Sequence, residues 1–135
     1  MTLPAAHMLV PGAAEGPLLR LSRPVSFWGG VDPRTGRIAD PRHPQAGEPL
    51  AGRIVAMERV IGSCSGSSVL LELAFARLAP AALILGEPDA IAAIGAVVAA
   101  AMELPPIPVL LLPAALHDRL PSRLRIASDG RLAAA

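Results

Sequence analysis

The chain has 135 residues, of which 53% are hydrophobic and only three are aromatic; this size and apolar content fit one domain with a buried core and exclude a disordered or collagen-like chain. Its positive charge comes from twelve arginines without a lysine, against eleven acids and a formal net charge of +1, so no basic surface for nucleic acid or anionic lipid is expected. The longest uncharged apolar stretch, between Asp89 and Glu103, has 13 residues, whereas a membrane-spanning helix needs roughly 20.

Two further features bear on localisation and metal content. The first twenty residues lack the basic start and the continuous apolar run of a secretory leader, since Pro4, Pro11 and Gly12 interrupt them. We therefore expect a cytoplasmic protein that does not enter a membrane. The single cysteine, Cys64, excludes an intrachain disulfide and cannot by itself hold zinc or an iron–sulfur cluster. Any metal would need other ligands or another chain.

Proline and glycine divide the first part of the chain into short extended pieces. Residues 7–10 and 18–22 are predicted strands, and residues 29–52 are rich in turn-forming residues. A strand-like run follows over residues 53–60. The first half is therefore expected to be β structure or irregular chain.

Strands and helices alternate in the second half. A cluster of small residues at 62–68 leads into a predicted helix over 69–78, which is followed by a strand at 82–85. A second helix opens on a proline and two acids, which suit a first turn, and runs to Met102. Residues 109–112 form a further buried strand.

This alternation is typical of parallel strands covered by helices. We predict an α/β fold in one compact domain over residues 1–135, with the β pieces of the first half extending or flanking the sheet. The tail from Leu116 onward matches no motif and is expected to be a final strand or an added contact.

The cluster at 62–68 stands where a strand leads into a helix, so unpaired amides at the helix start favour an anion there. Its four serines could cap the helix or point a hydroxyl into a cleft. The lack of lysine excludes a phosphate-binding P-loop. A nucleophile elbow, with glycines two before and two after, fits only Cys64, between Gly62 and Gly66. That cysteine would need His117 as its imidazole, whereas a lone cysteine is more commonly a small packed thiol.

A second block, residues 26–33, places two of the three aromatics directly before a double glycine and an acid. One interpretation is a tight turn whose aromatics fill the core. The other is that Gly29 and Gly30 let the backbone approach a ligand or a partner closely, with Asp32 and His43 lining the same place.

Together and in this order, the two blocks resemble the small subunit of the aconitase X family, a swivel-domain polypeptide that works with a separate or fused large subunit. The run Ser-Phe-Trp-Gly-Gly-Val-Asp-Pro at 26–33 and the run Gly-Ser-Cys-Ser-Gly-Ser at 62–67 carry the resemblance. It extends over most of the chain and includes His43 with Pro44.

The resemblance implies a swivelling β/β/α domain and a hydro-lyase reaction in which water leaves a small hydroxy acid. The large subunit of the family carries iron, as an iron–sulfur cluster or a related centre, so this chain would bind no cofactor itself and would act as one half of a heterodimer. The small subunit supplies the serine that accepts the proton, which falls on Ser63 here. The residues expected to line the substrate are Gly29, Gly30, Asp32, His43, Gly62 and Ser67.

Known substrates of the family are cis-3-hydroxy-L-proline in bacterial members and mevalonate 5-phosphate in archaeal ones. The alanine-rich, lysine-free composition and the pair Cys64-Ser65 are more similar to the bacterial group. Ile61 departs from the smaller or more polar residues that many members have before the glycine–serine pair, and this bears on the choice of substrate.

Two other functions stay open at this point. One is a hydrolase or amidase that uses Cys64 and needs no partner. The other is a binding module whose loop at 62–67 holds a phosphate or a carboxylate without turnover. For the dehydratase, the helix amides would stabilise charge on Ser63, and Arg53 or Arg59 could add positive charge, although a solvated strand position is the commoner use of such an arginine.

Overall fold

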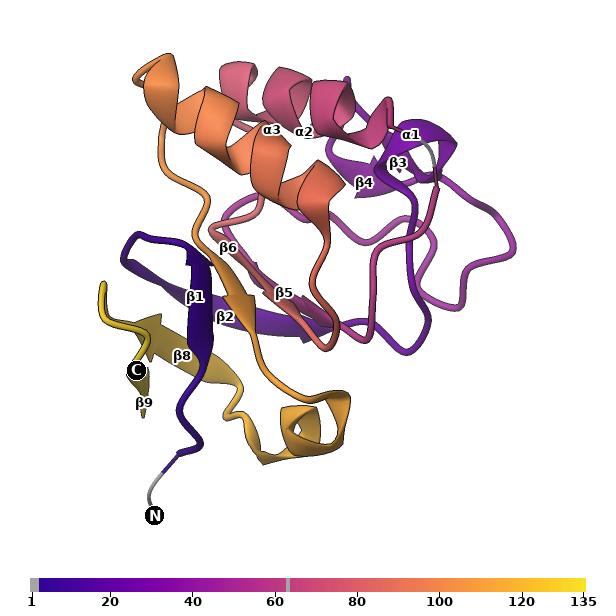
Figure 1. Ribbon diagram of the computed structural model, residues 1–135. Helices are drawn as coiled ribbons and strands as arrows, with labels where there is room; N and C mark the ends of the chain where they lie inside the picture. Colours follow the sequence, from indigo (N-terminus) through magenta and orange to yellow (C-terminus); the bar gives the residue numbers. More distant parts are fainter. Residues whose placement is uncertain (1–2, 63) are drawn as a thin grey trace.

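A computed structural model describes residues 3–62 and 64–135. Its main feature is a seven-stranded sheet of strand order β1-β7-β6-β5-β2-β8-β9, with a separate two-stranded hairpin (Figure 1). The strands of the large sheet are β1 His7–Val10, β2 Ala14–Arg20, β5 Ile54–Met57, β6 Ala82–Leu85, β7 Val109–Leu111, β8 Arg123–Ile126 and β9 Leu132–Ala134. The hairpin consists of β3 Val31–Asp32 and β4 Arg37–Ile38.

The four central strands, β7, β6, β5 and β2, are parallel, whereas β1, β8 and β9 pair antiparallel at the two sides. Every residue of β5 and β6 is buried, which explains why both strands are continuous apolar runs. Successive side chains point to opposite faces: Val55 packs into the core on one face and Ile54 into the core on the other. The predicted parallel strands are therefore confirmed, inside a sheet that is mixed at its edges.

Two helices cover one face of the sheet (Figure 1). Helix α2, Gly66–Phe75, connects β5 to β6, and helix α3, Ala90–Ala101, connects β6 to β7. Both crossovers advance the sheet in the same direction, and because such connections are almost always right-handed they place both helices on the same side. A Cβ at Gly95 would lie 3.0 Å from the carbonyl oxygen of Ser67, so glycine allows the two helices to pack closely.

Both helices end in the same way. The amide of Leu78 donates to the carbonyl of Leu73 at 2.8 Å, and the amide of Leu104 donates to that of Ala99 at 3.0 Å. The residue before each of these closing amides, Arg77 or Glu103, has a positive φ, which is the Schellman arrangement with a residue other than glycine.

The predicted helix at 69–78 is therefore found three residues earlier in the chain, from Gly66 to Phe75. The second helix begins where predicted, and the Asp89 carboxylate accepts the Ala92 amide at 2.8 Å as its N-cap. In the described part of the chain, no helix has the length and the apolar character that crossing a membrane requires.

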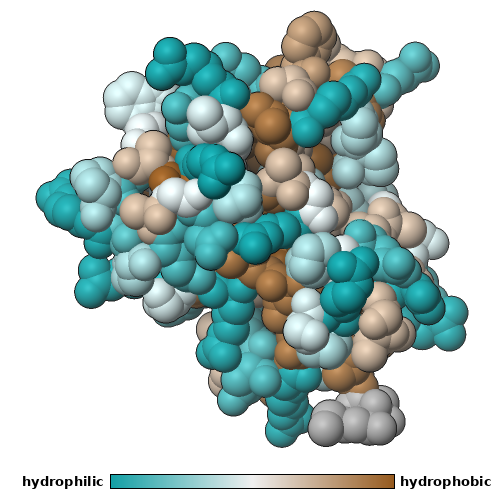
Figure 2. Space-filling model, turned by 180° about the vertical axis from the view of Figure 1, so that it is seen from behind, coloured by the Kyte–Doolittle hydropathy of each residue, from teal (hydrophilic) through white to brown (hydrophobic). Residues whose placement is uncertain are grey.

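The opposite face of the sheet is covered by the C-terminal tail. A 3-10 helix, η1 Ala114–Arg119, precedes β8 and β9 and lies on the side away from α2 and α3 (Figure 1). The sheet curls, so that the turn before β9 meets the start of β1: a Cβ at Gly130 would lie 2.7 Å from the carbonyl oxygen of Ala6. Seen from behind, hydrophobic residues also reach the surface in the helical layer at the top of the molecule (Figure 2).

Candidate functional site

The two sequence blocks meet at the carboxyl ends of β2 and β5. These strands are parallel neighbours, so the chain segments that follow them start side by side. Val25 pairs with Val60 in an isolated parallel bridge, and the amide of Ile61 donates to the carbonyl of Val25 at 3.2 Å. Residues separated by more than 30 positions are thus joined at the sheet edge where open α/β folds bind ligands.

The contact between the blocks requires glycine at position 62. A Cβ on Gly62 would overlap the hydroxyl of Ser26 and would lie 2.9 Å from the Ser26 Cβ, and the φ of Gly62 is +112°. The Ser26 hydroxyl itself donates to the carbonyl of Trp28 at 2.8 Å. Ser26 of the first block therefore makes a hydrogen bond within its own block and also contacts Gly62 of the second block.

The start of α2 is fixed by the same block. Gly66 is buried, and a Cβ there would lie 3.8 Å from the Cβ of Phe27 and 3.5 Å from a methyl group of Ile91. The half-buried Ser67 donates its hydroxyl to the carbonyl of Cys64 at 3.1 Å, so this serine closes the turn that enters the helix. The N-terminal end of α2, which is the positive end of its dipole, therefore lies next to the loop that follows β5.

The short segment α1, Phe27–Gly30, decides between the two interpretations of the aromatics. Phe27 is buried, as expected of a side chain that fills the core, but Trp28 is 61% exposed. Trp28 and Gly29 have non-helical backbone angles, with a φ of +81° at Gly29, where a side chain would meet open space. Gly30 is buried with its Cβ position 3.2 Å from a methyl group of Val25. The block is thus anchored at both ends and exposed in its middle.

Asp32 lies in the β3–β4 hairpin. Its carboxylate accepts the amide of Arg34 at 2.9 Å, and its carbonyl accepts the amide of Gly36 at 2.8 Å. The Cβ position of Gly36 lies 3.1 Å from Leu78, which directly follows the C-terminal end of α2. The hairpin therefore runs away from the loop at 62–67, and Asp32 shapes the turn there.

His43 is 7% exposed, and both nitrogens of its ring have backbone partners. Nε2 donates to the carbonyl of Arg23 at 3.0 Å, and Nδ1 accepts the amide of Gln45 at 3.0 Å. With these contacts the buried imidazole connects the loop at 40–47 to the segment that follows β2. Its two ring nitrogens are therefore used to hold the backbone.

Gln45 makes the same connection and was missed by reasoning from the sequence. Its side-chain oxygen accepts the amide of Ser22 at 2.9 Å, and its side-chain nitrogen donates to the carbonyl of Arg20 at 2.9 Å. The amide group thereby pairs with the backbone as a neighbouring strand would. No motif marks a glutamine in this role, and only its position two residues after His43 offers a hint.

The two arginines considered as a source of positive charge lie at opposite ends of β5. Arg53 precedes the strand and pairs with the carboxylate of Glu48 at 2.9 Å, so it is remote from the loop that follows the strand and is not a source of charge there. Arg59 follows the strand, is exposed, and lies on the same edge as the loop.

Cys64 and His117 are not brought together. Cys64 is exposed at the entry to α2, whereas His117 is buried in η1, on the other side of the sheet, and shares a 2.8 Å hydrogen bond with the carbonyl of Leu112. Among the described residues, no three His, Cys, Asp or Glu side chains are grouped so that they could hold a metal ion. The geometry therefore gives no support to a cysteine hydrolase.

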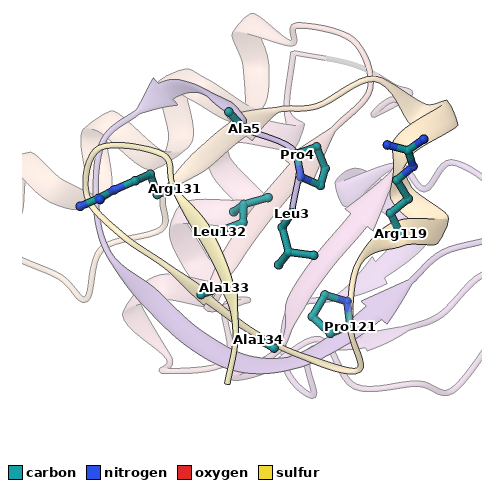
Figure 3. Close-up of a pocket in the computed structure, with 9 residues that line it drawn as sticks. All are labelled: Leu3, Pro4, Ala5, Arg119, Pro121, Arg131, Leu132, Ala133 and Ala134. Atoms are coloured by element: carbon teal, nitrogen blue, oxygen red, sulfur yellow. The ribbon is translucent and has the colours of Figure 1, made fainter. Parts of the chain in front are cut away.

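A cavity of about 790 Å³ lies elsewhere, between the N-terminal segment and β9 (Figure 3). Leu3, Pro4 and Leu132 form its apolar wall, and Arg119 and Arg131 stand at its rim. Arg131 is paired with Asp129 at 2.8 Å. This cavity contains none of the residues of the two sequence blocks.

Comparison with known proteins assigns the fold and the blocks to one family. The family model described as the aconitase X swivel domain matches residues 4–131. The chain is 43% identical over 132 residues to a cis-3-hydroxy-L-proline dehydratase of Pseudomonas aeruginosa, covering 94% of this chain and 23% of that enzyme. It is 41% identical over 121 residues to an enzyme of the same name from Hypocrea jecorina, covering 90% of this chain and 20% of the relative.

A shorter relative and a solved structure agree with this assignment. The phosphomevalonate dehydratase small subunit of Pyrococcus furiosus is 46% identical over 91 residues, which are 67% of this chain and 68% of the subunit. The crystal structure of holo aconitase X from Thermococcus kodakaraensis superimposes with a TM-score of 0.81 at 32% identity, covering 95% of this chain and 93% of that chain. The chain spans about a fifth to a quarter of the length of the two hydroxyproline dehydratases.

Proposed function

Because the chain belongs to the aconitase X swivel domain family, we propose that it is the swivel-domain part of a hydro-lyase that dehydrates a small hydroxy acid, cis-3-hydroxy-L-proline in the first instance. Ser63 is the proposed proton acceptor; this residue lies outside the part of the chain that the structure describes. The large subunit, or its fused equivalent, is the proposed partner, and we place the enzyme in the cytoplasm.

One observation carries the proposal: the block at 26–30 and the loop around Gly62 are joined at the carboxyl edge of β2 and β5, at the entrance to α2. Catalytic groups need a rigid support, and two strands, a helix and the buried Phe27 hold Gly62 and Gly66, the glycines on either side of the proposed serine in the sequence. The exposed Trp28 and Ile61 leave the outer side of this segment open to a partner.

Dehydration breaks a C–H bond and a C–O bond and forms a C=C double bond, and the proton removed from carbon and the departing hydroxyl together make up the water that is lost. A neutral serine hydroxyl is a poor base, so Ser63 has to react as an alkoxide that takes the proton from carbon. The positive end of the α2 dipole and the guanidinium of Arg59 on the same edge would lower the cost of that charge.

The proposed iron or iron–sulfur centre belongs to the large subunit, where it would supply Lewis acidity for the leaving hydroxyl. The described residues of this chain gather no ligand set for it. The chain on its own is therefore expected to be folded but inactive. Substrate-lining roles remain our proposal for Gly29, Gly30, Gly62 and Ser67, whereas for Asp32 and His43 the hydrogen bonds favour a positioning role.

Mevalonate 5-phosphate is the second candidate substrate, favoured by the similarity to the Pyrococcus small subunit. That similarity covers 67% of the chain, whereas the similarity to the Pseudomonas hydroxyproline dehydratase covers 94%. The wider match is the reason to rank the hydroxyproline first.

The test is to co-express the chain with the large subunit of its enzyme and to measure loss of each substrate by the purified complex. Ser63→Ala should abolish dehydration and leave assembly intact, while Ser68→Ala, an exposed serine of the same cluster, should keep normal turnover. Normal turnover by Ser63→Ala would overturn the role of the serine. Dehydration of mevalonate 5-phosphate alone would overturn the choice of substrate.

A further inference from the structure

Helix α3 carries its large apolar side chains on the outside. Over Ala90–Ala101 it contains no charged residue. The exposed fraction is 53% for Ile94 and 54% for Val97, and Val98 and Met102 are exposed as well. These four positions have the spacing of a single helix face. We call these four residues, of which Met102 is the C-cap, the outer face of α3.

The inward side of α3 is already packed against the rest of the domain. It packs through small residues, since Ala92, Ala96 and Ala99 are buried and Gly95 lies against α2. A surface helix of an isolated domain normally has the reverse pattern, with apolar residues inside and polar residues outside. A helix that is apolar all round is typical of one buried in a larger protein.

The first turn of α3 lies beside the proposed site. Ile91, in the first turn of α3, lies 3.5 Å from the Cβ position of Gly66, the first residue of α2. Phe75, the last residue of α2, is 71% exposed, and α2 lies beside α3 in the helical layer (Figure 1). The apolar surface and the loop that bears Ser63 are therefore presented by the same pair of helices.

We propose that the outer face of α3 is the docking surface for the large subunit of the dehydratase; this rests on the proposed function. In the Pseudomonas relative the matched residues are 23% of the chain, so a domain of this kind works beside a much larger part. The loop can reach a substrate held by that part only if the large subunit approaches the carboxyl edge of the sheet, and α3 starts at that edge, where Ile91 lies against Gly66. Because the helix offers no charge to pair with, the complementary surface must be apolar.

The test uses Ile94→Glu and Val97→Glu in the full chain. Glutamate has a higher helix propensity than isoleucine or valine, so the isolated chain should keep its fold, as circular dichroism and its melting temperature will report. Each change would place an unpaired carboxylate in the interface, and we expect the affinity for the purified large subunit, measured by calorimetry, to fall about 100-fold. Ala115→Glu, at an exposed position of η1 on the other side of the sheet, adds the same charge and should change the affinity less than about twofold.

The outcomes separate the two proposals. If the unaltered chain does not bind the large subunit, the proposed function fails. If it binds and both variants bind equally well, the docking surface is wrong while the function stands. If the variants abolish self-association in sedimentation experiments and leave binding to the large subunit unchanged, the face serves a second copy of this chain and the inference is overturned.

Discussion

Replacing Gly62 by alanine tests whether the contact between the two sequence blocks holds the site together. The φ of +112° disfavours any L-residue by about 1–2 kcal/mol. The new methyl group would also displace the Ser26 side chain, whose Cβ lies 2.9 Å away, and such overpacking costs about 1–3 kcal/mol. We expect Gly62→Ala to lower the free energy of unfolding by about 3 kcal/mol, which for a chain of this length lowers the melting temperature by about 10 °C.

Urea unfolding followed by circular dichroism measures the change, and two further variants isolate its cause. Gly47→Ala has the same kind of backbone, with a φ of +90°, but a Cβ there meets nothing within 4 Å, so it should show the backbone cost alone, about 1 kcal/mol. Ser26→Gly in the Gly62→Ala background removes the clash and should recover part of the loss. An equal cost for Gly62→Ala and Gly47→Ala, or no recovery, would refute the close contact.

Three further predictions concern groups away from the loop. His43→Ala leaves the carbonyl of Arg23 and the amide of Gln45 without their partner and should cost about 2–4 kcal/mol in urea unfolding, whereas an exposed imidazole would cost nothing measurable. Glu103→Gly relieves a φ of +59° and should stabilise the chain by about 1 kcal/mol in the same assay; destabilisation would count against the Schellman end of α3. The hydrogen bond from Arg125 holds the pKa of Glu15 below its ordinary value of 4.5, so the stabilisation that this pair gives is present above pH 4.5 and disappears as the pH falls through the lowered value. Arg125→Ala should therefore weaken the loss of unfolding free energy that is measured as the pH is lowered below 4.5. An unchanged loss at low pH would show that the pair contributes nothing.

The alternating half of the chain could be predicted because its strands are buried on both faces. Ala82–Leu85 is apolar throughout and ends at a glycine, and the helix after it opens on the Asp89 cap. Both features are local, and local features can be recognised from the sequence. The helix boundaries were less accurate, because Arg77 adopts the left-handed conformation that normally marks a glycine.

Long-range pairings could not be predicted in the same way. Nothing local in Ala14–Arg20 indicates that β2 enters the middle of the sheet between β5 and β8. The same holds for the C-terminal tail, because nothing local indicates that η1, β8 and β9 lie on the side of the sheet away from α2 and α3 (Figure 1). The position of such elements depends on which apolar face of the sheet remains to be buried, and that is decided by the packing of the whole chain.

The site shows the same division. The sequence interpretation that Gly29 and Gly30 approach a ligand or a partner stays a prediction, while the structure shows close approaches within the chain, of Gly62 to Ser26 and of Gly30 to Val25. The sequence did not show that Asp32 turns a hairpin away from the loop, or that the partners of His43 are backbone groups. A polar residue near a motif serves structure as readily as chemistry, and only its hydrogen-bond partners distinguish the two roles.

The position of β2 explains how one chain holds both blocks together. If β2 lay at an edge of the sheet, the segment after it would be free to move relative to the loop that follows β5. The first half of β2 pairs with β8 and its second half pairs with β5, and Gln45 and His43 fasten the segment that leaves it. The two blocks are therefore held together within this chain, and under the proposed function a rigid-body movement of the whole domain would be enough to bring them to a substrate or take them away.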